Sequence, residues 1–331
     1  MKNELAGMIN PTHDIKLFSG RSNPELAEEI AQHLGTTVGP MVIKDFADGE
    51  IYVQVQESVR GEDVFIVQPT CKPVNQNLME LLIIIDAFKR ASAKSITAVI
   101  PYYGYARQDR KTSGREAITA KLAADLLTTA GCSRVLAVDL HSGQIQGFFN
   151  ILVDHIFATS ILVNHIKELG LKSEDLVIVS PDTGGVKRAR NFAKDLKCPY
   201  AIIDKRRDKH NEAIANCVIG DVKGKTCVMC DDIIDTAGSI TEAAKLLKKE
   251  GAEDIYVCAV HPIFSGPAIQ RLNDAPIKEV VITNTIPLDT SKLPPKIKQL
   301  SVANLLAQAI SRIHDDESIS SLFGFEKEMK V

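Results

Sequence analysis

Along the chain, apolar positions follow two patterns in turn, short continuous runs and a recurrence every three or four residues. Apolar runs of five to eight residues, typical of buried strands, precede stretches in which apolar residues recur every three or four positions, as on one face of a helix. The pattern predicts strands at 15–19, 64–68, 95–101, 135–140, 176–181, 200–204, 225–230, 255–262 and 280–285. It predicts helices at 24–34, 75–91, 118–130, 185–196, 239–250 and 303–313, with a crossover near residues 151–160.

This alternation of strands and helices predicts parallel sheets covered by helices on both faces, and the arrangement occurs twice. The expected fold class is therefore α/β, with two tandem domains that each contain a mainly parallel sheet flanked by helices. No strong internal sequence repeat accompanies it, so the duplication is one of architecture. Functional residues are expected at the carboxyl ends of the strands, where open α/β sheets bind their ligands.

Composition limits the partners and the compartment. The 331 residues suffice for two domains, and 39 basic against 42 acidic residues give no pull towards nucleic acid or membrane. No apolar run approaches the ~18 residues of a membrane span, and residues 1–14 read as a short polar leader rather than a signal peptide.

Seven scattered cysteines fit a reducing, cytoplasmic location. Cys227 and Cys230 form a CxxC pattern, but they lie inside a predicted strand, where positions three apart point to opposite faces. No second pair completes a zinc site, so core packing is the favoured interpretation.

The segment DDIIDTAGS, which begins at Asp231, joins a predicted strand to a predicted helix. Residues 236–239 fall at the helix start, where unpaired backbone N–H groups and the helix dipole favour a phosphate. Asp231 and Asp232 precede them, and carboxylates beside a phosphate site suit ribose hydroxyls or a metal ion. An ordinary helix start, with Asp235 or Thr236 as the N-cap, is the alternative.

Other motifs have simple explanations when each is taken alone. His141 follows a strand, where a single histidine is more often structural than a ligand. The basic run 205–210 is typical of a solvated surface, and the tyrosines and arginines of 101–111 could contact nucleic acid. FADGE at 46–50 reads as an amphipathic turn, and SISSLF at 318–323 reads as a tail.

Taken together, these motifs resemble a known family. DDIIDTAGS resembles the phosphoribosyl-diphosphate binding motif of type I phosphoribosyltransferases and of ribose-phosphate diphosphokinases. Five further motifs resemble the diphosphokinases in order and spacing: PYYGYARQDRK (101–111), DLHSGQIQGFF (139–149), SPDTGG (180–185), DKRR (204–207) and SISSLF (318–323). A type I phosphoribosyltransferase would share DDIIDTAGS but has no reason to carry YARQD, a second α/β domain or SISSLF. The chain, from about residue 15 to 323, therefore resembles the class I ribose-phosphate diphosphokinases (phosphoribosyl diphosphate synthetases).

The resemblance implies transfer of the β,γ-diphosphate of Mg-ATP to the C1 hydroxyl of ribose 5-phosphate, giving 5-phosphoribosyl 1-diphosphate and AMP. The product would serve the biosynthesis of purines, pyrimidines, NAD, histidine and tryptophan. The implied cofactor is Mg²⁺, and the implied partners are ATP and ribose 5-phosphate. Inorganic phosphate would activate the enzyme, ADP would inhibit it, and the chain would form a homo-oligomer, a hexamer built from dimers.

The resemblance also implies site residues. The catalytic residues would be Lys205 and Arg207, on a mobile lid over the triphosphate. The ATP-binding residues would be Phe46, Asp48 and Glu50 from a neighbouring subunit, and Arg107, Gln108 and Asp109. The metal-associated residues would be His141 and Asp182. The ribose 5-phosphate site would comprise Asp231, Asp232, Asp235, Thr236, Ala237, Gly238 and Ser239. The allosteric site would comprise Ser58, Arg60, Ser318, Ser320 and Phe323.

The implied domains are residues 12–157 on the ATP side and 158–299 on the ribose 5-phosphate side, with the tail 300–323 returning to the first. Two segments depart from the family pattern: TSGRE (112–116) is less basic, and Ser142 and Gly143 replace the commoner residues after the histidine. No residue stands out as a general base. A catalytically silent associated regulatory subunit is the alternative, although such proteins carry an insertion near the catalytic loop that this chain lacks.

Overall fold

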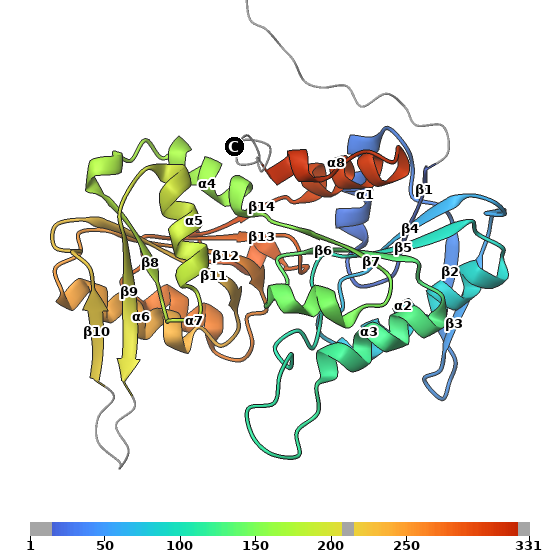
Figure 1. Ribbon diagram of the computed structural model, residues 1–331, viewed down its shortest axis with the longest axis horizontal. Coiled ribbons are helices and arrows are strands. Elements are labelled where there is room, and N and C mark those ends of the chain that lie inside the picture. Colours follow the sequence, from blue (N-terminus) through green and yellow to red (C-terminus); the bar gives the residue numbers. More distant parts are fainter. Residues whose placement is uncertain (1–14, 207–214, 324–331) are drawn as a thin grey trace, which may run out of the picture. The chain divides into compact units, whose positions relative to one another are not determined.

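The computed structural model describes residues 15–206 and 215–323 (Figure 1). Within them the chain forms two compact units. The first unit comprises the described residues up to Phe157, the short segment Thr285–Pro287 and the described residues from Ser301 onward. The second unit comprises the described residues of Ala158–Asn284 together with Leu288–Leu300.

The first unit is built on a five-stranded parallel sheet in the order β1-β4-β5-β6-β7. Its strands are β1 (Ile15–Ser19), β4 (Asp63–Val67), β5 (Ser95–Ile100), β6 (Arg134–Val138) and β7 (Leu152–Ile156). One face is covered by α1 (Pro24–Leu34) and α8 (Ala303–His314), and the other by α2 (Val74–Arg90) and α3 (Thr119–Ala130) (Figure 1). Each face thus buries a separate apolar layer.

Helix α1 shows how local sequence sets these elements. The side chain of Asn23 caps the helix by accepting a hydrogen bond from the Leu26 N–H, and Pro24 occupies the first helical position. Gly35 ends the helix in the left-handed conformation, at φ 69°. The helix bounds agree with the prediction of a helix at 24–34, which is confirmed.

An antiparallel hairpin projects from the first unit beside α2 (Figure 1). It consists of β2 (Met41–Asp45) and β3 (Ile51–Val55). The sequence predicted only a turn at 46–50, and that segment is the tip of this hairpin. Both strands were missed because their side chains are exposed or only half-buried, which leaves no continuous apolar run.

The second unit contains a seven-stranded sheet in the order β10-β9-β8-β11-β12-β13-β14, parallel except for β10. Its strands are β8 (Leu176–Ser180), β9 (Tyr200–Arg206), β10 (Ala215–Ile219), β11 (Thr226–Ile234), β12 (Ile255–Pro262), β13 (Glu279–Thr283) and β14 (Ile297–Leu300). One face carries α4 (Thr159–Glu168) and α5 (Val186–Leu196), and the other carries α6 (Gly238–Lys249) and α7 (Ala268–Asp274) (Figure 1). Short 3₁₀ turns are η1 (Gly143–Phe148), η2 (Ser173–Asp175), η3 (Thr290–Lys292) and η4 (Ser320–Phe323).

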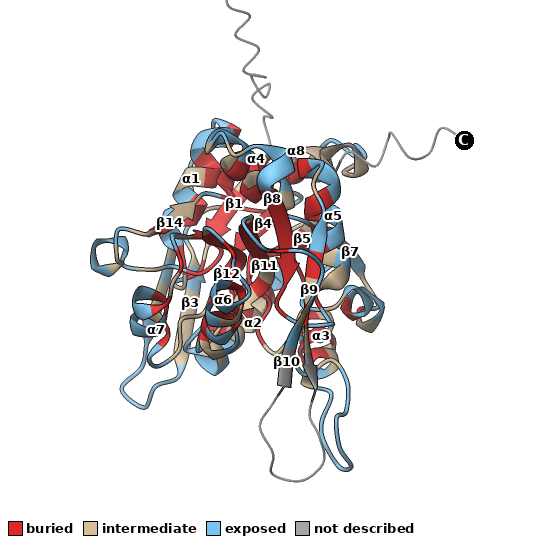
Figure 2. Cartoon of the chain, turned by 90° about the vertical axis from the view of Figure 1, so that its left-hand side faces the viewer, coloured by how far each residue is buried: buried red, intermediate tan, exposed pale blue. Residues whose placement is uncertain are grey.

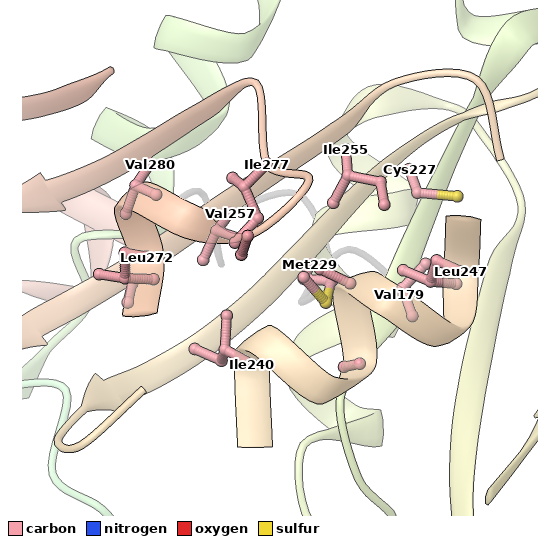
Figure 3. Close-up of a cluster of buried hydrophobic side chains, with 14 of the residues drawn as sticks. Val179, Cys227, Met229, Ile240, Leu247, Ile255, Val257, Leu272, Ile277 and Val280 are labelled. Carbon is pink, nitrogen blue, oxygen red and sulfur yellow. The ribbon is translucent and has the colours of Figure 1, made fainter. Parts of the chain in front are cut away.

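Buried residues lie along the strands and on the helix faces turned towards them (Figure 2). Between the second sheet and α6–α7, Met229 and Val257 of the strands pack near Ile240, Leu247 and Leu272 of the helices (Figure 3). Burying such side chains contributes roughly 1.5–3 kcal/mol each. The α/β expectation, with two parallel sheets flanked by helices, is confirmed.

Cysteine usage also agrees with the sequence. Cys227 and Cys230 are fully buried in β11, and all seven cysteines are free thiols, so the core-packing interpretation is confirmed. Within residues 15–206 and 215–323, no group of three or more His, Cys, Asp or Glu side chains could hold a metal ion. None of the helices described there has the length and apolarity needed to cross a membrane.

Candidate active site

The acidic pair lies in the strand itself. Strand β11 was predicted to end at Cys230, but it continues to Ile234, because its ladder with β12 extends through the pairs Asp231↔Ala259 and Ile233↔His261. The predicted strand end is therefore wrong by four residues. The ladder with β8 ends at Met229, so Asp231 and Asp232 occupy the part of β11 that extends past β8.

Arg188, in the first turn of α5, contacts both carboxylates. Its Nη1 lies 3.0 Å from Asp231 Oδ1, and its Nη2 lies 3.2 Å from Asp232 Oδ1. Asp232 is almost fully buried, whereas a quarter of the Asp231 side chain is exposed. Burial and the neighbouring charge of Asp232 raise the pKa of Asp231 to about 7, and Arg188 acts in the opposite direction. The pair can therefore accept hydrogen bonds from hydroxyl groups, and its ionisation changes near neutral pH.

The segment after the pair forms a strained helix start. Helix α6 begins at Gly238, and its N-cap is Ala237 in the left-handed conformation, at φ 59°, with no side-chain capping bond. The alternative of an Asp235 or Thr236 N-cap is therefore wrong. Arg271 of α7 donates from Nη1 to the Thr236 carbonyl at 3.0 Å, which brings a positive charge next to the turn. A helix start and a guanidinium together favour a bound phosphate.

Asp182 lies in the loop from β8 to α5 and is exposed. Its Oδ1 accepts hydrogen bonds from the N–H groups of Gly184 (2.8 Å) and Gly185 (3.0 Å). The Ser180 hydroxyl donates to the Asp182 carbonyl at 2.7 Å, and a Cβ at position 185 would lie 2.8 Å from that hydroxyl. Because β8 and β11 are parallel neighbours, Asp182 and the acidic pair lie at the same edge of the sheet.

His141 is held in the first unit by a neighbouring histidine. The loop after β6 turns at Asp139, whose φ is 39°, and His141 is exposed. His155 of β7 accepts a hydrogen bond at Nε2 from the Leu140 N–H at 2.9 Å, and its Nδ1 lies 3.3 Å from Gln146 Nε2. His155 thus fixes the loop that presents His141.

His141 of the first unit and Asp182 of the second are each an exposed side chain that the resemblance associates with Mg²⁺. A single carboxylate, such as Asp182, is a typical protein ligand for this ion, which keeps several waters and takes phosphate oxygens for the rest. An imidazole is a less suitable direct ligand, so His141 fits better through a water or a phosphate oxygen. Each side chain, taken by itself, fits an ion that arrives with a nucleotide.

The loop after β5 is held close to the sheet at its start. The Gly104 N–H donates to Thr70 Oγ1 at 2.6 Å, and a Cβ on Gly104 would lie 2.3 Å from the Thr70 carbonyl oxygen. Further along, Thr119 donates to Gln108 Oε1 at 2.6 Å. Arg107 is exposed and Asp109 is half-buried. Since β5 and β6 are parallel neighbours, this loop and the His141 loop leave the sheet at the same edge.

The segment TSGRE (112–116), which departs from the family pattern, forms a turn held by hydrogen bonds between its own residues. The Glu116 carboxylate accepts hydrogen bonds from the N–H and hydroxyl groups of both Thr112 and Ser113. These bonds, that from the Ser113 hydroxyl first, lower the pKa of Glu116 to about 2. The segment is thus a compact turn closed by the Glu116 carboxylate.

Three of the predicted ATP-binding residues, Phe46, Asp48 and Glu50, lie at the tip of the β2–β3 hairpin. Phe46 is about half exposed, and its ring meets Tyr52 edge-on at 5.8 Å. The turn closes through Gly49, at φ 92°, and through the Asp48 carboxylate, which accepts a hydrogen bond from the Glu50 N–H at 3.1 Å. The tip presents an aromatic ring and two exposed carboxylates.

The predicted allosteric residues lie in two turns of the first unit. Ser58 and Arg60 are exposed on either side of the buried Val59. After α8, the hydroxyls of Ser318 and Ser320 lie 2.6 Å apart. His314 Nδ1, at the end of α8, lies 3.5 Å from Asp63 at the start of β4. The end of α8, from which residues 315–323 continue, therefore lies near the start of the strand that follows Ser58 and Arg60. The side chain of Phe323 lies outside the described part.

The predicted catalytic residues lie at the end of β9. The backbone of Lys205 pairs with Asn216 of β10, but its side chain is outside the described part, as is the whole of Arg207. Arg188, Arg271 and His155 were missed by sequence reasoning because each acts across elements. Arg188 does lie three residues after the glycines that precede α5, which is a local signal in the sequence. Its contact with β11, however, can be inferred only once the order of the strands in the sheet is known.

Two family models match the chain. One describes the N-terminal domain of ribose phosphate pyrophosphokinase and covers residues 15–131. The other describes a phosphoribosyl synthetase-associated domain and covers residues 209–324. Both agree with the motif order from which the resemblance was inferred.

Relatives match over nearly the full length. A ribose-phosphate pyrophosphokinase of Gloeobacter violaceus is 59% identical over 310 residues, 93% of each chain. The chloroplastic ribose-phosphate pyrophosphokinase 2 of Arabidopsis thaliana is 58% identical over 93% of this chain and 78% of its own. The crystal structure of phosphoribosylpyrophosphate synthetase from Mycobacterium smegmatis superposes with a TM-score of 0.87 at 48% identity, over 92% of this chain and 99% of that one. The chain therefore belongs to the ribose-phosphate pyrophosphokinases, the diphosphokinase family that its motifs resemble.

Proposed function

We propose that this protein transfers the β,γ-diphosphate of ATP to the C1 hydroxyl of ribose 5-phosphate, giving 5-phosphoribosyl 1-diphosphate and AMP. The observation that carries the proposal is the juxtaposition in β11 and α6 of a buried acidic pair and a helix start that favours phosphate. Such a pair suits a sugar phosphate: the acids accept from hydroxyls while the helix start holds the phosphate.

On the ribose 5-phosphate side, the second unit supplies the residues. The 5-phosphate would be held by the hydroxyls and N–H groups of the α6 start, namely Asp235, Thr236, Ala237, Gly238 and Ser239. Asp231 and Asp232 would accept from the ribose hydroxyls and so orient C1. Arg188 holds both carboxylates and keeps Asp231 more acidic than burial alone would allow.

The chemical step exchanges one phosphorus–oxygen bond for another. The C1 oxygen forms a bond to the β-phosphorus, and the bond from that phosphorus to the oxygen shared with the α-phosphorus breaks. AMP leaves with that oxygen and its electron pair, and the C1 hydroxyl proton passes to solvent. Positioning and charge stabilisation carry most of the catalysis in such transfers, which agrees with the lack of an evident general base.

On the ATP side, the first unit supplies Arg107, Gln108 and Asp109, and the hairpin tip of a neighbouring subunit supplies Phe46, Asp48 and Glu50. Lys205 and Arg207 would stabilise charge on the triphosphate. Bound Mg²⁺ would neutralise phosphate oxygens, with Asp182 as ligand and His141 reaching it through water or ATP.

Regulation and assembly complete the proposal. Ser58, Arg60, Ser318, Ser320 and Phe323 would bind inorganic phosphate as activator or ADP as inhibitor. The assembly would be a hexamer built from dimers, and the location would be cytoplasmic, as the free thiols suggest. Residues 12–157 with the tail 300–323 would form the ATP side, and 158–299 the ribose 5-phosphate side.

Phosphorus NMR of the reaction products tests the function. Purified protein is incubated with Mg²⁺, ATP and ribose 5-phosphate, with and without inorganic phosphate. Equal amounts of AMP and a C1 diphosphate support the proposal, and faster turnover with phosphate supports the regulatory site. Nucleotide binding without product would instead favour the regulatory-subunit alternative.

Two substitutions test the residue roles. Asp232→Asn and Lys205→Ala are each expected to lower kcat/KM at least about 100-fold, because each removes a charge placed at the reacting groups. Full turnover in either variant would contradict the assignment of that residue.

A further inference from the structure

Arg21 lies between the core of the first unit and its hairpin. Its guanidinium makes a forked contact with Asp45, the last residue of β2: Nη2 lies 2.8 Å from Oδ1 and Nη1 lies 3.1 Å from Oδ2. On its other side, Nε donates to Glu80 Oε2 of α2 at 2.6 Å. The backbone N–H of Arg21 donates to Glu80 Oε1 at 2.7 Å. One side chain therefore joins α2 to the outer end of β2.

The inner end of this bridge is rigid. Glu80 is almost fully buried, at 1% exposed, and the fully buried Gln68 donates to its Oε1 at 3.1 Å. Gly20 lets the chain approach this cluster, because a Cβ there would lie 2.2 Å from Gln68 Oε1. A buried carboxylate with so many donors has one stable orientation, and it fixes the position of Arg21.

The outer end of the bridge lies where the hairpin loses its apolar support. Met41, Ile43, Val53 and Val55 pack against the core of the first unit. Side chains alternate along a strand, so Asp45 continues the face that Met41 and Ile43 begin. Beyond it, residues 46–50 are exposed. Asp45 is therefore the last inward contact before the tip.

We propose that Arg21 is a positioning residue for nucleotide binding: by joining Glu80 to Asp45 it fixes the tip that carries Phe46, Asp48 and Glu50. The proposal rests on the proposed function in so far as that tip contacts ATP. The guanidinium of Arg21 also holds the pKa of Asp45 below its usual value, so the bridge stays charged at neutral pH. Arg21 itself touches no substrate in this account.

Asp45→Asn is the primary test, because it breaks the outer contact and leaves the buried Arg21–Glu80 pair intact. Hydrogen exchange of the β2–β3 amides is expected to speed up about two- to fivefold, the size typical of one partly exposed ion pair. The KM for ATP should rise by a similar factor, while kcat and the KM for ribose 5-phosphate stay unchanged. Asp45→Glu, which keeps the charge, should restore most of both values.

Asp86→Asn is the matched control, because it removes an exposed carboxylate of α2 that pairs with Arg90 of the same helix at 2.6 Å. A double-mutant cycle with Arg21→Gln tests the route of the effect. If Arg21 carries it, Asp45→Asn adds nothing in the Arg21→Gln background. Hairpin exchange equal to that of Asp86→Asn, or an undiminished effect without Arg21, would overturn the proposal.

The two proposals can fail separately. Hydrogen exchange reports on the bridge whether or not the protein is active. Faster exchange in Asp45→Asn therefore supports the bridge even if wild-type protein makes no AMP. Conversely, wild-type protein could make 5-phosphoribosyl 1-diphosphate while Asp45→Asn leaves hairpin exchange unchanged. That outcome would support the proposed function and contradict the positioning role of Arg21.

Discussion

Burial and the neighbouring Asp232 carboxylate disfavour the ionised form of Asp231. The positive charge of Arg188 favours that form. Arg188→Met should therefore raise the pKa of Asp231 above about 7. If ionised Asp231 binds the ribose hydroxyls, the acidic limb of kcat/KM for ribose 5-phosphate moves to higher pH. A rise of about one unit lowers the ionised fraction at pH 7 from about one half to about one eleventh, so we expect a loss of about fivefold or more at that pH.

The pH profile of the Arg188 variant needs a control at the same helix turn. Lys187→Met removes an exposed charge from α5 without touching the acidic pair, and its profile should match that of wild type. A purely structural role for Arg188 would lower activity equally at all pH values. That outcome would contradict the electrostatic role.

The same carboxylate makes a prediction about stability. Its folded pKa, about 7, lies above the ordinary value of 3.8, so the folded protein binds this proton more tightly than the unfolded chain does. The contribution of Asp231 is therefore greatest at low pH and is lost as the pH rises through about 7. Asp231→Asn should be more stable than wild type at pH 8, by about 1 kcal/mol or more, although it is expected to be inactive.

Urea unfolding of wild type and Asp231→Asn at pH 5 and pH 8 measures this difference. The difference between the free energies of unfolding of the two proteins should widen at the higher pH, because only wild type must ionise Asp231 there. A pH-independent gap would show that Asp231 titrates in the folded protein as it does in the unfolded chain.

At the scale of elements, the loop from β8 to α5 depends on a glycine. A Cβ at Gly185 would lie 2.8 Å from Ser180 Oγ, and that hydroxyl also donates to the Asp182 carbonyl. Gly185→Ala should displace the loop and lower the free energy of unfolding by about 1–3 kcal/mol. It should also reduce kcat/KM, because Asp182 moves with the loop. Thermal unfolding and steady-state kinetics measure the two effects.

Two further variants locate the cause of the Gly185→Ala effect. Gly114→Ala places a Cβ in open space and should leave stability nearly unchanged. Adding Ser180→Ala to Gly185→Ala removes the clashing hydroxyl and should recover part of the lost stability. If it recovers none, the clash is not the reason for the loss.

Periodicity predicted the elements that are continuously buried. The bounds of β1, α1 and β12 agree with the sequence, because apolar spacing and the Asn23 cap mark them clearly. The hairpin β2–β3 and the edge strands β10 and β14 were missed, since their residues are partly exposed and carry no strong period. Strand β11 was predicted too short because two acidic residues read as the end of an apolar run.

The residues of the candidate site also fall into two groups, those that the sequence marked and those that it did not. The segments that the sequence marks, 231–239 and 180–185, do lie at neighbouring strand ends of one sheet. The arginines that tune them, Arg188 and Arg271, come from helices whose neighbours depend on the strand order. Local sequence carries the chemistry of a site, whereas the charges around it follow from tertiary packing.

At the scale of the whole molecule, the proposal that the tip of one subunit completes the ATP site of another can be tested by mixing. Phe46→Ala lacks a functional tip, and Asp232→Asn lacks a functional ribose site. In a pair with one subunit of each variant, the intact tip of the Asp232→Asn subunit completes the site whose intact ribose part belongs to the Phe46→Ala subunit. Random assembly of equal amounts should restore about a quarter of wild-type activity, because half the pairs are mixed and each holds one intact site.

Activity is measured after the two variants are co-expressed, with each variant alone as the control. The double variant Phe46→Ala/Asp232→Asn mixed with wild-type protein calibrates random assembly. If the co-expressed variants stay inactive while the calibration behaves as expected, the tip serves its own subunit.

The first unit is closed by a helix from the far end of the chain. Ser301, just before α8, bonds to Glu29 of α1 across 272 positions of sequence, and α8 covers the face of α1. A ribosome adding 5–20 residues per second reaches α8 roughly 15–55 s after α1. During translation the second unit is therefore complete while the first still lacks its cover. The apolar surface that α8 later covers is exposed in that interval, so a chain released before α8 is made should be more open to proteolysis.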